Sequence, residues 1–228
     1  MAILRFRDSG KSITVGKIVC LGSNYAEHAK EMKTEVPRAP VVFLKPGTAL
    51  LHDGEDVVLP PFSSELHHEV EMVIVIGKEG KNVPIRAAYE YVAGYAVGLD
   101  MTLRDVQDQA KKKGLPWSVA KGFDTSAPVS AILRKELIDD PHNLDISLKV
   151  NGQIRQHSNT SKMVFRVHDA VSYLSGVFTL EPGDLIFTGT PEGVGRVVPG
   201  DMLEATLDRV GSLRVNIKQS PAEERGIL

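Results

Sequence analysis

Hydrophobic residues along this chain recur mostly in short runs bounded by Gly, Pro, Asn or Asp, a pattern typical of β-strands. Apolar positions at helical spacing are fewer and predict helices at residues 25–33 behind Asn24, at 103–113 capped by Thr102, and at 167–177. Sheet therefore dominates, and the pattern favours an α+β fold, a mixed sheet roll or barrel with short helices at its edges. The predicted strands cover residues 17–21, 41–44, 57–59, 68–76, 92–101, 144–150, 184–188, 202–207 and 213–217.

Turn signals and the lack of interruptions predict the organisation of the chain. Asn151-Gly152 lies between two alternating segments and predicts the two-residue turn of a β-hairpin. No repeat, low-complexity segment or long linker divides the sequence, so we expect one domain over residues 1–228. The polar segment 218–228 is expected to form a loose tail.

Charge and cysteine content narrow the classes of partner. The 27 basic and 29 acidic residues give a net charge of −2, which argues against nucleic-acid binding through a broad positive surface. Cys20 is the only cysteine, which excludes an internal disulfide and favours a reducing cytoplasm. The charged amino terminus lacks the apolar stretch of a signal peptide, and the longest apolar run, 72–76, is too short to span a bilayer. We therefore expect a cytoplasmic protein with no nucleic-acid or membrane partner.

Two acids interrupt the apolar run that begins at His68. Glu69 and Glu71 alternate along a predicted strand, so their carboxylates face the same way about 6.7 Å apart and can share one cation. Oxygen ligands favour Mg²⁺, Mn²⁺ or Ca²⁺ over zinc, and Asp100, a lone acid at the end of another apolar strand, is the candidate third ligand. The alternation fits the solvent face of an edge strand equally well. A zinc-protease motif is excluded, because Met72 stands where its second histidine is required.

His28 and Glu31 are spaced to touch on one face of a helix. A carboxylate beside an imidazole fixes the tautomer of the ring and supports it as a general base. Most pairs with this spacing are ordinary surface contacts, so the pair gains meaning only beside the acidic cluster.

Cationic and amide side chains follow the acids along the sequence. Arg104, Gln107 and Lys111 share one face of the helix after Asp100, which suits an anionic substrate or, equally, a solvated amphipathic helix. Lys121 lies in a mostly apolar segment, where a lysine either extends to solvent or binds an anion. The glycine-rich loop 189–195 matches neither a dinucleotide fingerprint nor a P-loop, so nucleotide binding is rejected.

Together these motifs resemble the fumarylacetoacetate hydrolase superfamily, in its short single-domain form of the acylpyruvase and oxaloacetate decarboxylase type. The resemblance covers residues 15–217, and the Glu-x-Glu pair, the distant Asp and the Thr-Gly-Thr-Pro loop are specific only in combination. The matching segments are GSNY at 22–25, FLKP at 43–46, HHEVE at 67–71, LDMTLRDVQ at 99–107, KKGLPW at 112–117, AK at 120–121, LKVNG at 148–152 and TGTPEGVG at 188–195.

This resemblance implies a mixed β-roll, a homodimer, and a Mg²⁺ or Mn²⁺ ion held by Glu69, Glu71 and Asp100. It also implies that His28 and Glu31 form a catalytic dyad. The remaining matching residues are expected to contact an anionic substrate or its developing charge: Lys121 as a third catalytic residue, and Lys45, Arg104, Gln107 and Thr190 in the substrate pocket.

The chemistry of these groups suits a small anionic 2-oxo acid. A divalent ion stabilises the enolate left when a carbon–carbon bond breaks, so we expect acylpyruvate hydrolysis with His28 activating water, oxaloacetate decarboxylation, or both. The alternatives are keto–enol tautomerisation of oxaloacetate, and an isomerase, decarboxylase or hydratase of a diacid from aromatic catabolism. A non-catalytic protein that binds a metal or a small acid is the competing class, and such a protein has no use for the pair of His28 and Glu31.

Overall fold

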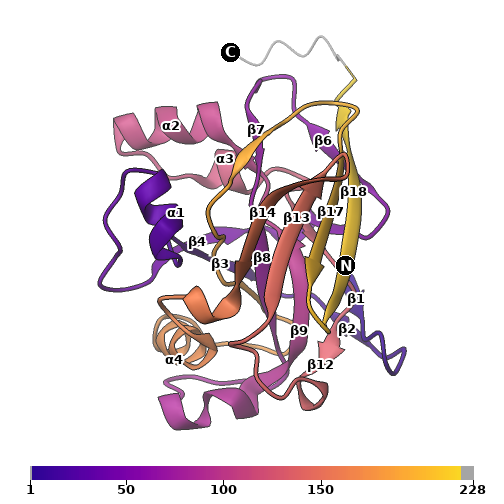
Figure 1. Cartoon of the computed structure of the whole chain (residues 1–228). Helices are drawn as coiled ribbons and strands as arrows, with labels where there is room; N and C mark the ends of the chain where they lie inside the picture. Colours follow the sequence, from indigo (N-terminus) through magenta and orange to yellow (C-terminus); the bar gives the residue numbers. More distant parts are fainter. Residues whose placement is uncertain (1, 222–228) are drawn as a thin grey trace.

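Two sheets form the core of the chain, whose computed structural model describes residues 2–221 (Figure 1). The eight-stranded sheet runs in the order β4 (Val41–Lys45), β3 (Ile18–Gly22), β15 (Leu185–Phe187), β8 (Val70–Ile76), β9 (Val92–Leu99), β11 (Ala127–Val129) and β5 (Leu50–His52), with β12 (Leu133–Arg134) paired to β9. The five-stranded sheet runs in the order β14 (Gln153–Asn159), β13 (Asp145–Val150), β17 (Met202–Leu207), β18 (Gly211–Gln219) and β6 (Asp56–Leu59).

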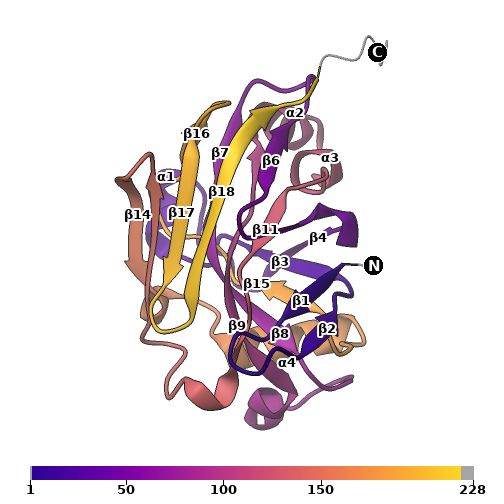
Figure 2. The same ribbon diagram turned by 90° about the vertical axis from the view of Figure 1, so that its right-hand side faces the viewer.

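Short elements complete the described chain and close the roll. Two small sheets consist of β10 (Thr102–Leu103), β7 (Leu66–His68) and β16 (Gly195–Val197), and of β1 (Ile3–Arg5) and β2 (Ser12–Thr14). The helices are α1 (Ala26–Glu31), α2 (Arg104–Lys113), α3 (Ser118–Lys121) and α4 (Val167–Val177), with 3₁₀ turns at Gly47–Ala49, Ile85–Tyr91, Lys135–Leu137 and Thr160–Lys162. Figure 1 shows α1, α2 and α3 gathered on the side of the molecule away from β17 and β18. Figure 2 shows β14 and β17 on one side and β1 to β4 on the other. The predicted α+β class, a mixed β-roll with short flanking helices, is confirmed.

Strand β8 separates two hydrophobic clusters, because its alternate side chains point to opposite faces of the sheet. Met72 and Ile74 pack in the cluster shared with the five-stranded sheet, whereas Val73 and Val75 pack with Phe187 in the other cluster. All seven residues of β8 are buried, as its nearly continuous apolar sequence predicts. The odd positions of the strand, which include Glu71, therefore lie on the face away from the five-stranded sheet.

The predicted strands 68–76 and 92–101 are wrong at the ends that matter for the site. The first is interrupted at Glu69, which separates β7 from β8, and the second ends at Leu99, one residue before Asp100. Beyond these points the chain pairs differently, because β7 joins β10 and β16 in the separate three-stranded sheet. The acids thus lie where regular pairing stops and a side chain can leave the sheet.

The helix caps predicted at Asn24 and Thr102 are also wrong. Helix α1 starts behind Tyr25 and α2 behind Leu103, and neither start has a side-chain cap. The Asn24 amide instead donates to the carbonyl oxygens of Phe165 and Thr188, and the Thr102 hydroxyl donates to the carbonyl oxygen of Asp100. Both side chains therefore fix the surroundings of the site rather than the ends of helices.

The predicted hairpin and the third predicted helix agree with the structure. Asn151 and Gly152 have φ angles of 51° and 78°, both in the left-handed region that the two-residue turn between β13 and β14 requires. Helix α4 has the predicted bounds.

Of the predicted tail, residues 218 and 219 still belong to β18, and residues 222–228 lie outside the described part of the chain. Between residues 2 and 221, no helix is both long and apolar enough to cross a membrane.

Candidate active site

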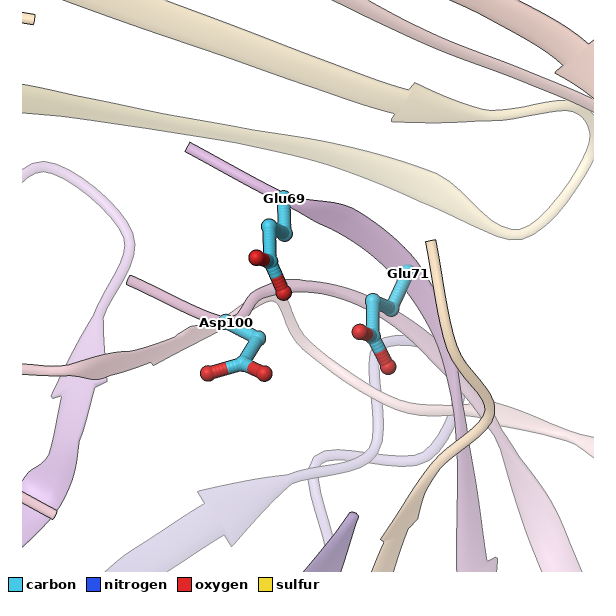
Figure 3. Close-up of side chains that lie close together, drawn as sticks. All are labelled: Glu69, Glu71 and Asp100. Atoms are coloured by element: carbon cyan, nitrogen blue, oxygen red, sulfur yellow. The ribbon is translucent and has the colours of Figure 1, made fainter. Parts of the chain in front are cut away.

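The register between β8 and β9 brings three acids together. Val70 pairs with Leu99, and just beyond this pair the Asp100 amide donates to the Glu69 carbonyl oxygen at 2.8 Å. Glu69, Glu71 and Asp100 each offer a carboxylate oxygen, and these atoms lie within 4.8 Å of one another. All three side chains are buried, and Figure 3 shows them converging from the two adjacent strand ends. The solvent-face alternative for Glu69 and Glu71 is therefore excluded.

Two cationic side chains neutralise this cluster from the side of the short helices. The ammonium group of Lys121, at the end of α3, donates to Glu69 at 2.8 Å and to Asp100 at 2.6 Å. Arg104, the first residue of α2, binds the other oxygen of Glu69 and donates to Gln107 at 2.6 Å. The predicted substrate residues Arg104 and Gln107 thus form one hydrogen-bonded chain with an acid of the cluster.

Lys45 also approaches the cluster but is enclosed by protein groups. Its side chain is fully buried, and its ammonium lies 2.8 Å from Asp100 Oδ1 and donates to the carbonyl and hydroxyl oxygens of Ser126 at 3.0 and 3.1 Å. It also donates to the carbonyl oxygen of Lys121. Lys45 does not line the cavity at the acids, so the structure places it behind Asp100, and its substrate-binding role stays a prediction.

The protonation of the acids differs because their neighbours differ. Burial and the nearby charges of Asp100 and Glu69 raise the pKa of Glu71 well above its ordinary value. Burial also acts to raise the pKa of Glu69, but Lys121 and Arg104 together hold it well below that value. The Asp100 Oδ1 atom is buried and accepts no hydrogen bond of good geometry, although the Lys45 ammonium is close. Three crowded carboxylates, one of which has a buried oxygen that accepts no hydrogen bond, form an all-oxygen donor set that suits a hard divalent cation.

The His28 and Glu31 side chains are in contact, as their spacing predicts. His28 Nδ1 lies 3.1 Å from Glu31 Oε2, and the buried imidazole lines the same cavity as the three acids. Glu31 is itself held by the backbone amide of Gly193, which donates to both of its oxygens at 3.1 and 3.2 Å. The loop after β15 therefore orients the carboxylate that orients the histidine.

The Thr-Gly-Thr-Pro loop is fastened directly to the strand that carries the acids. The Gly189 amide donates to Glu71 at 2.6 Å, and the Thr190 hydroxyl donates to the Val70 carbonyl oxygen at 2.9 Å. Gln156, a buried residue of β14, donates to Thr190 at 2.8 Å and accepts from the Val70 amide at 3.1 Å. Gln156 thus joins Thr190 to the acid-bearing strand, a role that nothing in its local sequence predicts.

A small cavity of about 60 Å³, the room of a few water molecules, opens over these groups. It brings together the predicted residues His28, Glu69, Glu71, Asp100, Arg104, Gln107, Lys121 and Thr190, and excludes Glu31 and Lys45 from its lining. The remaining lining residues are Leu21, Gly22, Ser23, Met32, Thr34, Phe43, Lys111 and Trp117. Aromatic and aliphatic side chains therefore form much of the cavity wall, and nothing in the sequence identified these residues as part of the site.

Comparison with known proteins identifies a single family across nearly the whole chain. Residues 17–218 match the family described as fumarylacetoacetate (FAA) hydrolase C-terminal. The chain is 52% identical to the mitochondrial oxaloacetate tautomerase FAHD1 of Rattus norvegicus, over 95% of this chain and 96% of the relative. It is 47% identical to the protein of the same name from Arabidopsis thaliana, over 89% and 91% of the two chains.

A solved structure agrees in fold as well as in sequence. The fumarylpyruvate hydrolase of Pseudomonas aeruginosa, determined in complex with Mn²⁺ and pyruvate, superposes with a TM-score of 0.91 at 40% identity and covers 96% of both chains. The resemblance inferred from the sequence motifs is therefore confirmed at the level of family and fold.

Proposed function

Because this chain belongs to the fumarylacetoacetate hydrolase family, we propose that it is a divalent-metal enzyme that acts on small 2-oxo acids through an enolate, with oxaloacetate tautomerisation as its reaction. The observation that carries this proposal is the meeting of three buried acids, two cations and His28, which Glu31 contacts from behind, at one cavity. Relatives about half identical to this chain are named oxaloacetate tautomerases, which favours oxaloacetate as the first substrate to test.

The proposed ion is Mg²⁺ or Mn²⁺, held by Glu69, Glu71 and Asp100. The oxygen-only donors, the unsatisfied Asp100 Oδ1 and the raised pKa of Glu71 all fit such an ion. When bound, it would supply Lewis-acid stabilisation of negative charge on the 2-oxo acid. The Mn²⁺ in the related fumarylpyruvate hydrolase supports a cation of this class.

The residues around the acids account for binding and proton transfer. Arg104 and Lys121 supply positive charge where a carboxylate and a developing enolate need it. With its Nδ1–H donating to Glu31, His28 keeps Nε2 free to accept a proton from the carbon next to the keto group and to return one. Keto–enol exchange balances if the proton that His28 takes from this carbon is delivered to the keto oxygen, and the reverse transfer restores the ketone.

Hydrolysis of an acylpyruvate is the second candidate, because the same histidine can instead activate a water molecule. The contact between His28 and Glu31 favours it, and the related structure is named a fumarylpyruvate hydrolase. Oxaloacetate decarboxylation uses the same stabilised enolate but needs no activated water.

One substrate panel distinguishes these reactions. Purified protein with Mg²⁺ or Mn²⁺ is given oxaloacetate, acetylpyruvate and fumarylpyruvate, and kcat/KM is measured for loss of the enol absorbance, for CO₂ release and for pyruvate release. The proposal expects the largest kcat/KM for enol–keto exchange of oxaloacetate. Rapid pyruvate release from an acylpyruvate, with no acceleration of exchange, would replace the tautomerase assignment by the hydrolase.

We also propose that the protein is a homodimer, as the family resemblance implies. Strand β4 lies at one edge of the eight-stranded sheet, and its exposed Val41 and Leu44 border an apolar surface cavity of about 670 Å³. An edge strand beside exposed apolar side chains is a common place for a second copy to bind. Light scattering should therefore give twice the chain mass of 24.9 kDa, and a mass of one chain at micromolar concentration would contradict the proposal.

The cytoplasmic location stays a prediction, since the names of the rat and plant relatives say mitochondrial.

A further inference from the structure

One face of helix α2 carries three polar side chains into the cavity. Arg104, Gln107 and Lys111 follow one another at helical spacing and all line it. Arg104 and Gln107 are buried and bonded to each other, and Arg104 also binds Glu69. Lys111, nearest the carboxyl end of the helix, is exposed, so it lies on the solvent side of the cavity.

Lys111 differs from the other cavity cations in having no acidic partner. Arg104 and Lys121 each bind a carboxylate of the cluster, whereas the Lys111 ammonium makes no ion pair with any residue between 2 and 221. It lies 5.3 Å from the centre of the Trp117 ring, a cation–π distance that holds the side chain over the cavity wall. Desolvation of its ammonium beside the cavity and the positive charge of Arg104 lower the pKa of Lys111, against the opposing charge of Asp108 on the same helix.

Two aromatic rings connect this lysine to the acid cluster along one side of the cavity, because the Lys121 ammonium lies 5.0 Å from the centre of the Phe43 ring and the Lys111 ammonium lies beside Trp117. Met32, Phe43 and Trp117 line the cavity together with the charged groups, and the rings of Phe43 and Trp117 lie 5.9 Å apart. Such a surface suits a short carbon chain that has one anionic end at the acids and the other at Lys111.

We propose that Lys111, held by Trp117, binds the distal carboxylate of the substrate, so that the enzyme selects 2-oxo dicarboxylates over 2-oxo acids with an uncharged tail. The proposal rests on the proposed function, because it assumes that the 2-oxo end of the substrate binds at the acids. It narrows the substrate class to diacids of a few carbons. Lys112 and Lys113, the next two residues of the helix, do not line the cavity and should contribute nothing to this selection.

Binding of two stable ligands tests the assignment without turnover. The pair 2-oxoglutarate and 2-oxopentanoate differ only in a terminal carboxylate or methyl group, and each is titrated calorimetrically into Mn²⁺-loaded protein. Lys111→Met should weaken 2-oxoglutarate binding about 10-fold or more, as expected for loss of a charge-assisted contact, and leave 2-oxopentanoate unchanged. Lys111→Arg should keep most of the preference. Lys112→Met, which removes the same charge one residue away, should change neither ligand by more than about twofold.

The outcomes separate this inference from the proposed function. An equal weakening of both ligands in Lys111→Met, or an equal effect of Lys112→Met, would overturn the distal-carboxylate assignment alone. If wild-type protein with bound Mn²⁺ held neither 2-oxo acid, the proposed function would fail, and this inference with it.

Discussion

The Lys121 ammonium lies 2.6 Å from Asp100 Oδ2 and contacts Glu69 with the same group, so one lysine bridges two of the three acids. Burial opposes its charge, but Asp100 and Glu69 more than compensate and raise the pKa of Lys121. Within residues 2–221, the third acid, Glu71, makes no ion pair, and the Gly189 amide is its one hydrogen-bond donor. Protein cations therefore lie beside two of the acids, whereas burial and the charges of Asp100 and Glu69 favour the protonated form of the third.

Ion binding should release the proton that Glu71 holds. The pKa of Glu71 is raised in the metal-free protein, so at a pH below this pKa the ion must displace a proton from Glu71 in order to bind. Mn²⁺ affinity should therefore rise with pH and level off above the pKa. Calorimetric titrations over a series of pH values, in two buffers of different ionisation enthalpy, should show proton release on Mn²⁺ binding that declines as the pH rises, because burial and the charges of Asp100 and Glu69 favour the protonated form of Glu71. Glu71→Gln should bind the ion weakly and release no such proton. Proton-free Mn²⁺ binding by the wild type throughout this pH series would contradict the account of Glu71.

Loss of Lys45 should destabilise the protein even without a substrate. Lys45→Met removes the cation beside the buried Asp100 carboxylate. It also removes the hydrogen bonds that Lys45 donates to the carbonyl oxygens of Ser126 and Lys121, so the free energy of unfolding should fall by about 3 kcal/mol. Urea unfolding in EDTA measures this change. Lys30→Met, which removes an exposed lysine paired with Glu27, should cost less than about 0.5 kcal/mol. Comparable small losses in both variants would mean that Lys45 does not hold Asp100.

A methyl group at Gly189 should disturb the loop that binds Glu71. Gly189 has a φ of +91°, and a Cβ there would lie 2.7 Å from the Asn24 Cβ and 3.1 Å from the Leu21 carbonyl oxygen. Gly54 has a φ of +85° with nothing within 4 Å of such a Cβ, so Gly54→Ala measures backbone strain without crowding. Gly189→Ala should therefore lower the free energy of unfolding by about 1–3 kcal/mol more than Gly54→Ala does, as followed by urea unfolding. Equal costs would show that the loop can move away from Asn24 without penalty.

His28 should affect the two carbon–carbon bond-breaking activities unequally. If it activates water, His28→Ala should reduce acylpyruvate hydrolysis by about 10²–10⁴-fold, whereas oxaloacetate decarboxylation, which needs no water, should fall less. Rates are measured on the same preparation, with protein-free Mg²⁺ controls for spontaneous decarboxylation. A parallel fall in both activities, at unchanged metal affinity, would show that His28 does not act on water.

The sequence predicted the acids better than it predicted their surroundings. Glu69 and Glu71 alternate within an apolar run, a spacing that fits a shared cation and the solvent face of an edge strand equally well, and only the burial of both side chains excludes the solvent face. The contact between His28 and Glu31 followed from helical spacing. The approach of Asp100 to both glutamates depends on the register of β8 and β9, for which the sequence offered only a lone acid at the end of a strand.

Other parts of the site depend on contacts between distant segments. Gln156 reaches Thr190 and Val70 from the other sheet, and its sequence neighbours carry no sign of this role. Short elements such as α3 and β10 escaped prediction, because four or two residues are too few for a periodic pattern. The assigned caps failed at Asn24 and Thr102 because tertiary hydrogen bonds competed for the same side-chain groups.

The central claim, that this site forms the enolate of a 2-oxo acid, is tested most directly by hydrogen exchange of pyruvate. In D₂O with Mg²⁺, the methyl protons of pyruvate can be replaced only through the enolate, and ¹H NMR follows the loss of their signal. Wild-type protein should accelerate the loss well above the protein-free rate, and Glu71→Gln should not. A methyl signal that persists equally with both proteins, although the wild type is shown calorimetrically to bind Mg²⁺ and pyruvate, would contradict enolate chemistry at this site.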